Sequence, residues 1–473
     1  MSQSTPTGKQ SLDQALQEYQ QLFTVSAEKL QQITAHFITE LAKGLTKAGG
    51  NIPMNPTWVL DFPTGKEKGD YLAIDLGGTN LRVVLVRLNG DRTFTTEQHK
   101  YALPENIRTA TKEELWTNIA DSLDAFVKQH FPNGVDHDLP LGFTFSYPAT
   151  QYSIREGILQ RWTKGWDIDG VEGHDVVPML QAEITKRNIP IDIVAVINDT
   201  TGTMVASAYT DPETKMGLIY GTGCNGAYYE RCCDVGKLEG RLEDDISPDT
   251  LMAINCEYGS FDNEHLVLPR TRFDITVDDE SPRPGQQAFE KMISGYYLGE
   301  ILRLVLLEMM ERGAIFQGQD TAKLDKKFVM DTSFPASVEE DDTADLTEVE
   351  RLFKSELGIS TTLEERKAIR KLSELIGIRS ARLSVCGIAA ACKKRGYTSA
   401  HCAADGSLYQ KYPHFPQRAA QALRDIFQWE SKEDPITITH AEDGSGVGAA
   451  VIAALTERRI REGLSVGVKK DSK

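Results

Sequence analysis

Apolar and polar residues along the chain follow two different periods, and each period predicts one kind of element. Between Gly69 and Asp199, short apolar runs of strand length alternate with helical patterns, the clearest of which runs from Thr111 to His130. The apolar run Ile191 to Val196 predicts a buried strand that ends at a polar turn. Strands that alternate with helices are typical of α/β domains, so the sequence predicts an α/β fold.

The first 50 residues predict a polar tail followed by two amphipathic helices. The first helix places Leu12, Leu16, Tyr19 and Phe23 on one face. The second has its apolar face from Leu30 to Leu45 and ends at the glycine pair Gly49-Gly50. We interpret both helices as packing elements without chemistry of their own.

Three further patterns lie in the second half of the chain. The longest helical pattern runs from Gln286 to Arg312, with Gly313 as the stop signal. Residues 383–391 combine an apolar run with small residues, which we interpret as a passage from a strand into a helix. The acidic segment from Val338 to Glu350 predicts a solvated loop and the start of a helix.

Two glycine-rich turns carry the first chemical signal. Gly77-Gly78 separates two apolar runs, and Gly221-Thr222-Gly223 does the same further along, so both predict hairpins rather than strand-to-helix loops. Glycines let the backbone approach a phosphate closely and direct N–H groups at it. Such hairpins are also common structural devices. Two of them in the same setting suggest a duplicated nucleotide fold that holds one triphosphate from both sides.

Asp199 lies between these turns, directly after the predicted strand that ends near Val196. Ligands of open α/β sheets bind beyond the carboxyl ends of the strands, so this carboxylate is a candidate general base. The alternative is an aspartate that only caps the following helix. The flanking glycine turns favour the catalytic interpretation.

Several motifs together resemble the fungal hexokinases, members of the superfamily of sugar kinases, actin and Hsp70. They occupy residues 141–148, 161–165, 197–200, 255–259 and 284–291, and the resemblance extends from about Ile52 to about Val466. It implies a duplicated ribonuclease H-like, actin-like ATPase fold with two lobes flanking a cleft. It also implies transfer of the γ-phosphoryl group of ATP to the 6-hydroxyl of glucose, fructose or mannose, the first step of glycolysis.

The resemblance implies a hexose pocket of charged and amide side chains, which suits a ring of hydroxyl groups that both donate and accept. Glu290 has an alternative explanation, because a glutamate near a helix start is favourable with the helix dipole. Lys164 has one as well, as a cation stacked on Trp162 or Trp166. The implied hexose-binding residues are Ser146, Lys164, Asn198, Asp199, Asn225, Glu257 and Glu290.

The same resemblance assigns catalysis and the nucleotide. Asp199 would take the hydroxyl proton, and Lys164 would bind the sugar and the developing charge. Asp75 would orient Mg²⁺, carried in as MgATP, through its water shell. The implied ATP-binding residues are Asp75, Gly77, Gly78, Thr79, Asn80, Arg82, Lys100, Thr222, Gly223, Gly387, Gly444 and Ser445. The small residues around Gly387 would equally permit close helix packing, and the glycines from 444 onward would equally serve a hinge.

Composition narrows the functional class. A chain of 473 residues is long enough for two cores. We therefore expect an N-terminal helical segment (1–64) on the large lobe, a small domain (65–199), a large domain (200–465, with 445–460 near the hinge) and a tail (466–473).

A net charge of −17 argues against binding to nucleic acid or an anionic membrane surface. We expect no membrane span, and seven cysteines without a metal-ligand spacing favour a reducing cytoplasm.

Two alternative functions stay open at this level. One is a sugar-responsive regulatory protein that keeps the fold without turnover, although both turns and the catalytic residues are retained. The other is a glucose-selective glucokinase, whose pocket residues are the same. We expect hexose and ATP as partners, and a homodimer remains open.

Overall fold

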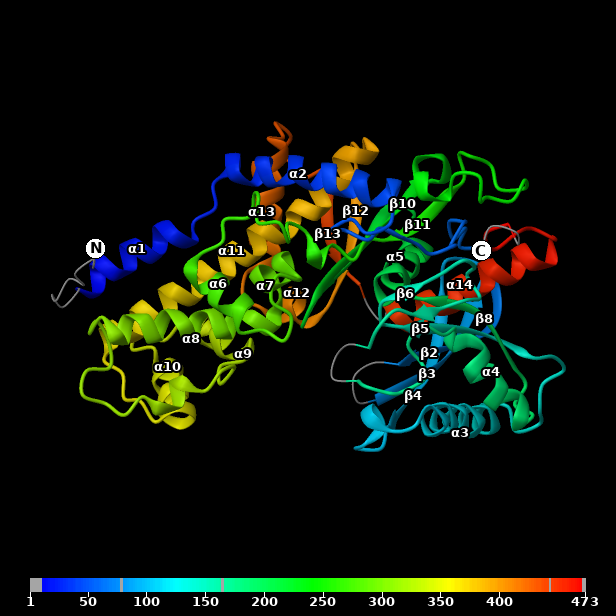
Figure 1. Cartoon of the computed structure of the whole chain (residues 1–473), viewed down its shortest axis with the longest axis horizontal. Helices are drawn as coiled ribbons and strands as arrows, with labels where there is room; N and C mark the ends of the chain where they lie inside the picture. Colours follow the sequence, from blue (N-terminus) through cyan, green and yellow to red (C-terminus); the bar gives the residue numbers. More distant parts are fainter. Residues whose placement is uncertain (1–10, 77–79, 163–165, 442–443, 470–473) are drawn as a thin grey trace.

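The computed structural model describes residues 11–76, 80–162, 166–441 and 444–469, and two β-sheets form its framework (Figure 1). The first sheet has the strand order β4-β3-β2-β5-β8. Strands β4, β3 and β2 are antiparallel neighbours, whereas β2, β5 and β8 run parallel. The strands are β2 (Lys68–Leu76), β3 (Asn80–Asn89), β4 (Phe94–Ala102), β5 (Leu139–Phe145) and β8 (Ile191–Ile197). We call this sheet, with helices α3 (Lys112–His130) and α4 (Val176–Lys186), the small lobe.

The second sheet repeats the same order as β11-β10-β9-β12-β13, with β1 added at one edge. Again three antiparallel strands are followed by parallel neighbours. The strands are β1 (Asn55–Pro56), β9 (Thr214–Tyr220), β10 (Cys224–Arg231), β11 (Leu251–Asn255), β12 (Ala400–Asp405) and β13 (Ile436–His440). We call this sheet and the helices around it the large lobe. The repeated order confirms the duplicated α/β fold with two lobes and both predicted glycine hairpins.

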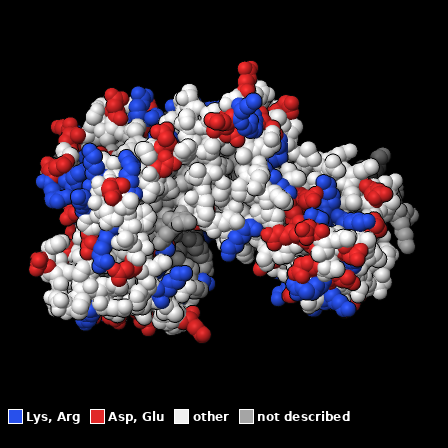
Figure 2. All heavy atoms as spheres, turned by 180° about the vertical axis from the view of Figure 1, so that it is seen from behind, with Lys and Arg blue, Asp and Glu red and all other residues white. Residues whose placement is uncertain are grey.

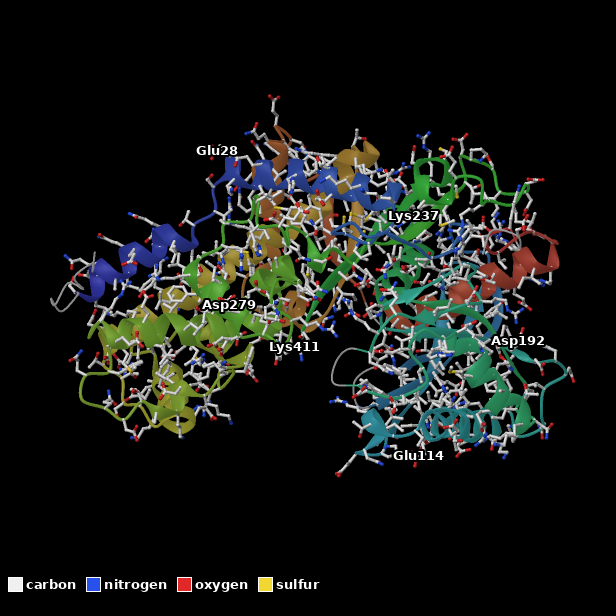
Figure 3. All side chains as sticks on the ribbon, in the orientation of Figure 1. Glu28, Glu114, Asp192, Lys237, Asp279 and Lys411 are labelled. Carbon is white, nitrogen blue, oxygen red and sulfur yellow. The ribbon has the colours of Figure 1, made fainter. Side chains whose placement is uncertain are left out.

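The strands β2, β3, β5 and β8 of the small-lobe sheet are largely buried, whereas the edge strand β4 is mostly exposed. Leu72, Ile74 and Leu76 of β2 lie in one core with Leu115 and the rest of the α3 face, whereas Ala73 belongs to the main core of the molecule. Alternate residues of a strand point to opposite faces, which explains the division. Helix α3 begins at a capping box: Thr111 accepts from the backbone N–H of Glu114 (3.2 Å), and the Glu114 carboxylate accepts from that of Thr111 (2.8 Å; Figure 3).

Helices cover the large-lobe sheet. The two predicted N-terminal helices are confirmed as α1 (Leu12–Phe23) and α2 (Ala27–Thr46), and both pack on α11 (Leu363–Arg395). The other helices here are α6 (Arg272–Asp279), α7 (Ala288–Ile293), α8 (Gly295–Glu311), α9 (Ser333–Glu340), α10 (Thr347–Leu352), α12 (Ser407–Lys411) and α13 (Phe415–Phe427). Short elements are β6 (Ala149–Thr150), β7 (Ile158–Leu159), η1 (Ile107–Thr109), η2 (Cys232–Asp234), η3 (Gly236–Leu238), η4 (Tyr258–Ser260), η5 (Ala322–Asp325) and η6 (Phe353–Leu357).

The predicted continuous helix from Gln286 to Arg312 is wrong, because the chain breaks at Ser294. This residue has an extended conformation (φ −82°, ψ 155°) and separates α7 from α8. The backbone N–H of Gly295 then donates to the carbonyl of Gly221 (2.8 Å) instead of into a helix. The apolar period continues across the break, since both helices face the same core, and so the pattern alone could not reveal it.

The strand-to-helix passage predicted at residues 383–391 is also wrong. This segment lies in the C-terminal half of α11, which with 33 residues is longer than α8. Residues from Leu383 to Cys392 are buried, so the helix has no polar face there. An apolar run without a helical period cannot be told from a buried strand by its sequence pattern.

The acidic segment Val338 to Glu350 is only partly a solvated loop. Helix α9 extends to Glu340, and Val338 and Glu339 are buried. The Glu339 carboxylate pairs with Arg418, and its burial raises its pKa. The ion pair with Arg418 thus explains why one acidic residue of this segment, Glu339, is buried.

One helix in the described part of the chain, α11, is long and apolar enough to cross a membrane, with a mean hydropathy of 1.5 in its most apolar window. Of that window 89% is buried inside the protein. Length and hydropathy are therefore those of a core helix.

Helices α5 (Asp199–Thr210) and α14 (Gly444–Arg461) join the two lobes (Figure 1). Helix α5 follows β8 of the small lobe but packs on β9 and β10 of the large lobe. Helix α14 follows β13 of the large lobe but packs on β2, β5 and β8 of the small lobe, although we expected residues 445–460 in the large domain. The helix that follows the last strand of each lobe thus packs on the sheet of the other lobe. The two helices also pack on each other.

Glycines make the contact between α5 and α14 very close. A Cβ at Gly448 would lie 2.0 Å from the carbonyl oxygen of Gly202, and one at Gly444 would lie 2.6 Å from the Cα of Thr203. Helix α14 also approaches β5, where a Cβ at Gly142 would lie 2.2 Å from the carbonyl oxygen of Ala449. Larger side chains at these positions would separate the helices.

The crossing predicts that Gly448→Ala destabilises the protein by about 3 kcal/mol or more, because overpacking outweighs the roughly 1 kcal/mol that alanine gains over glycine in a helix. Urea unfolding measures the change. Gly50→Ala is the control, since a Cβ there has its nearest neighbour at 3.5 Å, an ordinary contact. Equal stability of the Gly448→Ala variant and the wild type would contradict the proposed close contact.

Candidate active site

Asp199 is the first residue of α5, at the carboxyl end of β8. Asn198 is the N-cap, and its Oδ1 accepts from the backbone N–H of Thr200 (2.9 Å). The Asp199 Oδ1 accepts from the same N–H (2.8 Å) and from the Thr200 hydroxyl (3.2 Å). Because Asn198 holds the cap position, capping alone does not explain Asp199. Its carboxylate is held at the positive end of the helix dipole.

A cluster of amides and a carboxylate forms between β10 and β11. Asn225 Nδ2 donates to Asn255 Oδ1 (2.8 Å) and to Glu257 Oε1 (3.0 Å). Asn255 Nδ2 also donates to Glu257 Oε1 (2.9 Å). Asn225 and Glu257 were predicted as site residues, whereas Asn255 was not. Its motif was noticed, but its role depends on a cross-strand contact that the sequence does not contain.

Glu290 lies in the first turn of α7 and contacts the second glycine turn. Its Oε2 accepts from the backbone N–H of Cys224 (2.9 Å), and a Cβ at Gly223 would lie 2.6 Å from that oxygen. The pKa of the Cys224 thiol is raised by burial and by the carboxylates of Glu290 and Glu257. The helix dipole is therefore not the main explanation of Glu290, which has a specific backbone partner.

Gln287 is a further residue that sequence reasoning missed. It has a left-handed backbone (φ 57°), and its Oε1 is buried without a hydrogen-bond partner among the described residues. A Cβ at Gly259 would lie 2.6 Å from this oxygen, so it faces the segment that carries Glu257. A buried acceptor without a partner is costly, which points to a ligand donor there.

The strands on either side of the first glycine turn meet the start of α14 through Asp75 and Arg82. Ser445 Oγ donates to Asp75 Oδ2 (2.8 Å), and Arg82 Nη2 contacts both Ser445 Oγ and Asp75 Oδ2. Thr144 of β5 donates to the Ser445 carbonyl (2.9 Å). Gly444 begins the helix and packs on α5. The structure thus brings the predicted nucleotide residue Ser445 to Asp75 and Arg82, from which it is distant in the sequence.

Of the other residues predicted to bind the nucleotide near the first turn, two are exposed on strands and three lie outside the described residues. Asn80 begins β3 and is exposed, and Lys100 of β4 lies opposite Arg82 in the sheet and is also exposed. Gly77, Gly78 and Thr79 lie outside the described residues.

The second turn is closed by a hydrogen bond from the Gly221 N–H to the Gly223 carbonyl (3.0 Å), with Thr222 exposed at its tip. Gly406, at the carboxyl end of β12, packs directly behind it: a Cβ there would lie 2.4 Å from the carbonyl oxygen of Tyr220. Its backbone is left-handed (φ 115°), which favours glycine. Gly406 and Ser407 were not predicted as site residues, although an Asp-Gly-Ser sequence after a strand is a turn signal.

Among the described residues, the atoms nearest to a Cβ at Gly387 belong to Tyr258 and not to this turn. Gly387 lies inside α11, and a Cβ there would be 3.1 Å from the ring of Tyr258. The packing alternative for this segment accounts for the glycine without a ligand.

Ser146 follows the last residue of β5 and is half-buried. Lys164 lies outside the described residues. The indole rings of Trp162 and Trp166 stack on each other (5.5 Å between ring centroids), and each residue is about 4% exposed. Across the lobes, Arg283 Nη2 donates to the Trp162 carbonyl (3.5 Å).

Most predicted side chains thus lie at the carboxyl ends of parallel strands or in the turns beside them, in both sheets. This is the position where open α/β sheets bind ligands. Figure 2 shows that the surface is hollowed between the two lobes. Among the described residues no group of three or more histidine, cysteine, aspartate or glutamate side chains could hold a metal ion.

Comparisons with known proteins agree with this geometry. Two family models, both described as hexokinase, match residues 15–209 and 215–455. A hexokinase of Schwanniomyces occidentalis is 68% identical over 449 residues, which cover 95% of this chain and 94% of the relative. Hexokinase-2 of Saccharomyces cerevisiae is 66% identical over 461 residues, or 97% and 95% of the two chains. A solved structure of a Schistosoma mansoni hexokinase complexed with glucose is 33% identical, covers 94% of this chain and all of that one, and has a TM-score of 0.83.

Proposed function

Because the chain belongs to the hexokinase family, whose members phosphorylate hexoses with ATP, we propose that it transfers the γ-phosphoryl group to the 6-hydroxyl of glucose, fructose or mannose. One observation carries the residue assignment. The crossing of α5 and α14 links Asp199, at the start of one helix, to Ser445, at the start of the other, and Ser445 donates a hydrogen bond to Asp75 of β2. A coupled assay with the three sugars tests the substrate range, and turnover of glucose alone would leave the glucokinase alternative.

We propose that Asp199 is the general base. Among the described residues, both hydrogen bonds to its carboxylate go to Oδ1 and come from Thr200. Oδ2 is then the oxygen that accepts the proton of the 6-hydroxyl as this hydroxyl attacks the γ-phosphorus. The fixed carboxylate keeps the reacting groups in place, which is the main requirement of phosphoryl transfer.

The hexose pocket proposed here combines the carboxylates of Glu257 and Glu290 with the amides of Asn198 and Asn225. Ser146 and Lys164 come from the small lobe and would meet the sugar from the other side. Gln287 is an addition, because its unpartnered buried Oε1 suits a sugar hydroxyl as donor. A polar pocket of this kind rejects ligands that lack the matching hydroxyls.

For the nucleotide we propose the two glycine turns as phosphate contacts, with Thr79, Asn80, Arg82 and Lys100 on one side and Thr222 on the other. Gly406 and Ser407 join the second turn because Gly406 packs on its backbone. The N-terminus of α14 at Gly444 and Ser445 places a positive helix end beside Asp75, which favours an anion.

We propose Mg²⁺ as the cation of the substrate MgATP. A single carboxylate, Asp75, with the Ser445 hydroxyl beside it fits an ion that is bound mainly by phosphate oxygens and water. When bound, Mg²⁺ would neutralise phosphate charge as the phosphoryl group leaves. Arg82, at 3.4 Å from Asp75, holds this carboxylate in place.

We also propose a division into domains and a location. By its contacts, helix α14 belongs to the small domain (65–199) and helix α5 belongs to the large one. The hinge therefore lies where these two helices cross. The seven cysteines form no disulfides, which supports a reducing cytoplasm. A homodimer is the assembly to test by sedimentation.

Replacing Asp199 by Asn should lower kcat by about 10²- to 10⁴-fold, the usual effect of losing a general base, while glucose still binds. Turnover and calorimetric titration with glucose measure the two effects. Asp211→Asn is the matched control, because Asp211 caps the other end of α5 and contacts His401. A near-normal kcat of the Asp199→Asn variant would refute the assignment.

Glucose should draw the two lobes together, since the proposed pocket has residues on both. We expect a smaller radius of gyration by small-angle scattering and a changed tryptophan emission, because the stacked Trp162 and Trp166 lie beside the contact with Arg283. Replacing Trp166 by Phe should reduce the emission change. Replacing Trp429, which stacks on Phe427 in the large lobe, should not. An unchanged radius at saturating glucose would indicate a rigid molecule.

A further inference from the structure

The side chain of Asn255 is nearly buried, at 7% exposure, between two proposed hexose residues. It lies at the end of β11, opposite Ala227 of β10. Asn225 precedes that residue on β10 by two positions, so the side chains of Asn225 and Asn255 lie on the same face of the sheet. Two residues after Asn255, the chain places Glu257 beside both amides.

The Asn225 amide makes four hydrogen bonds within the protein, so a sugar hydroxyl that meets it shares one of these positions. Oδ1 accepts from the backbone N–H of Gly226 (2.7 Å) and from that of Glu257 (2.9 Å). Nδ2 donates to Asn255 Oδ1 (2.8 Å) and Glu257 Oε1 (3.0 Å). A primary amide offers two protons and two acceptor positions, so its orientation is completely determined.

This orientation determines that of Asn255 in turn. Its Oδ1 must face the Asn225 Nδ2, because two donors cannot bond to each other. Its Nδ2 then points to Glu257 Oε1, at 2.9 Å. Asn255 therefore supplies an acceptor to one proposed hexose residue and a donor to the other.

Glu257 needs this support because its backbone is left-handed (φ 58°, ψ 44°), a conformation that side chains with a Cβ rarely adopt. Such residues persist where their surroundings hold them, often at functional sites. Here the Asn225 Oδ1 holds the Glu257 N–H, and two amide donors converge on its Oε1.

We propose that Asn255 is a positioning residue for the hexose: it fixes the Asn225 amide and the Glu257 carboxylate in the orientation that the sugar meets. The inference rests on the hexose site proposed above. It assigns Asn255 no contact with the reacting atoms, so its loss changes the binding of the sugar more than the chemical step.

The test replaces Asn255 by Asp and by Ser. Asp keeps the size and the acceptor toward Asn225 but turns the donor toward Glu257 into a second carboxylate oxygen, and Ser removes both contacts without adding charge. Both variants should raise the KM for glucose by about 10-fold or more, the effect of a lost buried hydrogen bond. The KM for ATP should stay within about twofold, and kcat should fall less than the affinity for glucose.

Asn51→Asp is the matched control. The Asn51 amide donates to Glu40 Oε2 (3.4 Å), a glutamate of α2 that is buried in the large lobe, so the variant also places a carboxylate against a buried glutamate. It should lower the melting temperature and leave the KM for glucose unchanged. Thermal unfolding of all variants separates lost stability from lost positioning.

A double variant removes the repulsion between two carboxylates. When Asn255→Asp is combined with Glu257→Gln, the carboxylate introduced at position 255 faces a neutral amide that can still accept from Asn225, and the total charge of the pair is kept. The kcat/KM of this variant for glucose should exceed the product of the two single effects by about 10-fold, because residues in contact do not act additively.

The outcomes distinguish this inference from the site on which it rests. An unchanged KM for glucose in Glu257→Gln itself would refute the hexose site. A raised KM there, with unchanged values in both Asn255 variants, would refute only the positioning role. Equal rises in the KM for glucose and ATP with a lowered melting temperature, or strict additivity in the double variant, would also overturn it.

Discussion

The close contact between α5 and α14 is the constraint on which the rest of the structure depends. Two helix backbones approach so closely at Gly202 and Gly448 that no Cβ fits between them. Each helix begins where chemistry is expected, α5 at Asp199 and α14 at Gly444, next to Ser445. The distance between the proposed base and the proposed phosphate site is therefore set by main-chain packing, which is stiffer than contact through long side chains.

Much of the framework could be predicted from local sequence. The glycine hairpins, the strand before Asn198 and the two N-terminal helices carry their signals within a few residues, as turns, caps or apolar periods. The errors came where the tertiary structure overrides such signals. Helix α11 is buried around residues 383–391 and so lost its polar face, and the break at Ser294 is stabilised by Gly221, which is distant in the sequence.

The residues of the candidate site also divide into those that the sequence predicted and those that it did not. Asp199 was predicted from its position after a strand and between two glycine turns, whereas Glu257, Glu290 and Asp75 were predicted from the resemblance to a known family. Asn255, Gln287 and Gly406 were missed because their importance arises from contacts between segments: a cross-strand amide bond, a buried oxygen without a partner, and a backbone packed behind another turn. These are properties of the folded molecule, and the sequence pattern within any one segment does not contain them.

The exchange of terminal helices has a consequence for how this chain can be divided. A fragment that ends after Thr210 would contain the small-lobe sheet without α14, leaving the face that carries Ala73 and Val84 exposed to water. The complementary fragment would lack α5 and expose β9 and β10. Neither half contains its complete core, although each contains the five strands of its repeat. Fragment complementation and gene-splitting experiments should treat the two halves as interlocked parts of one folding unit, and a cut between them need not release either.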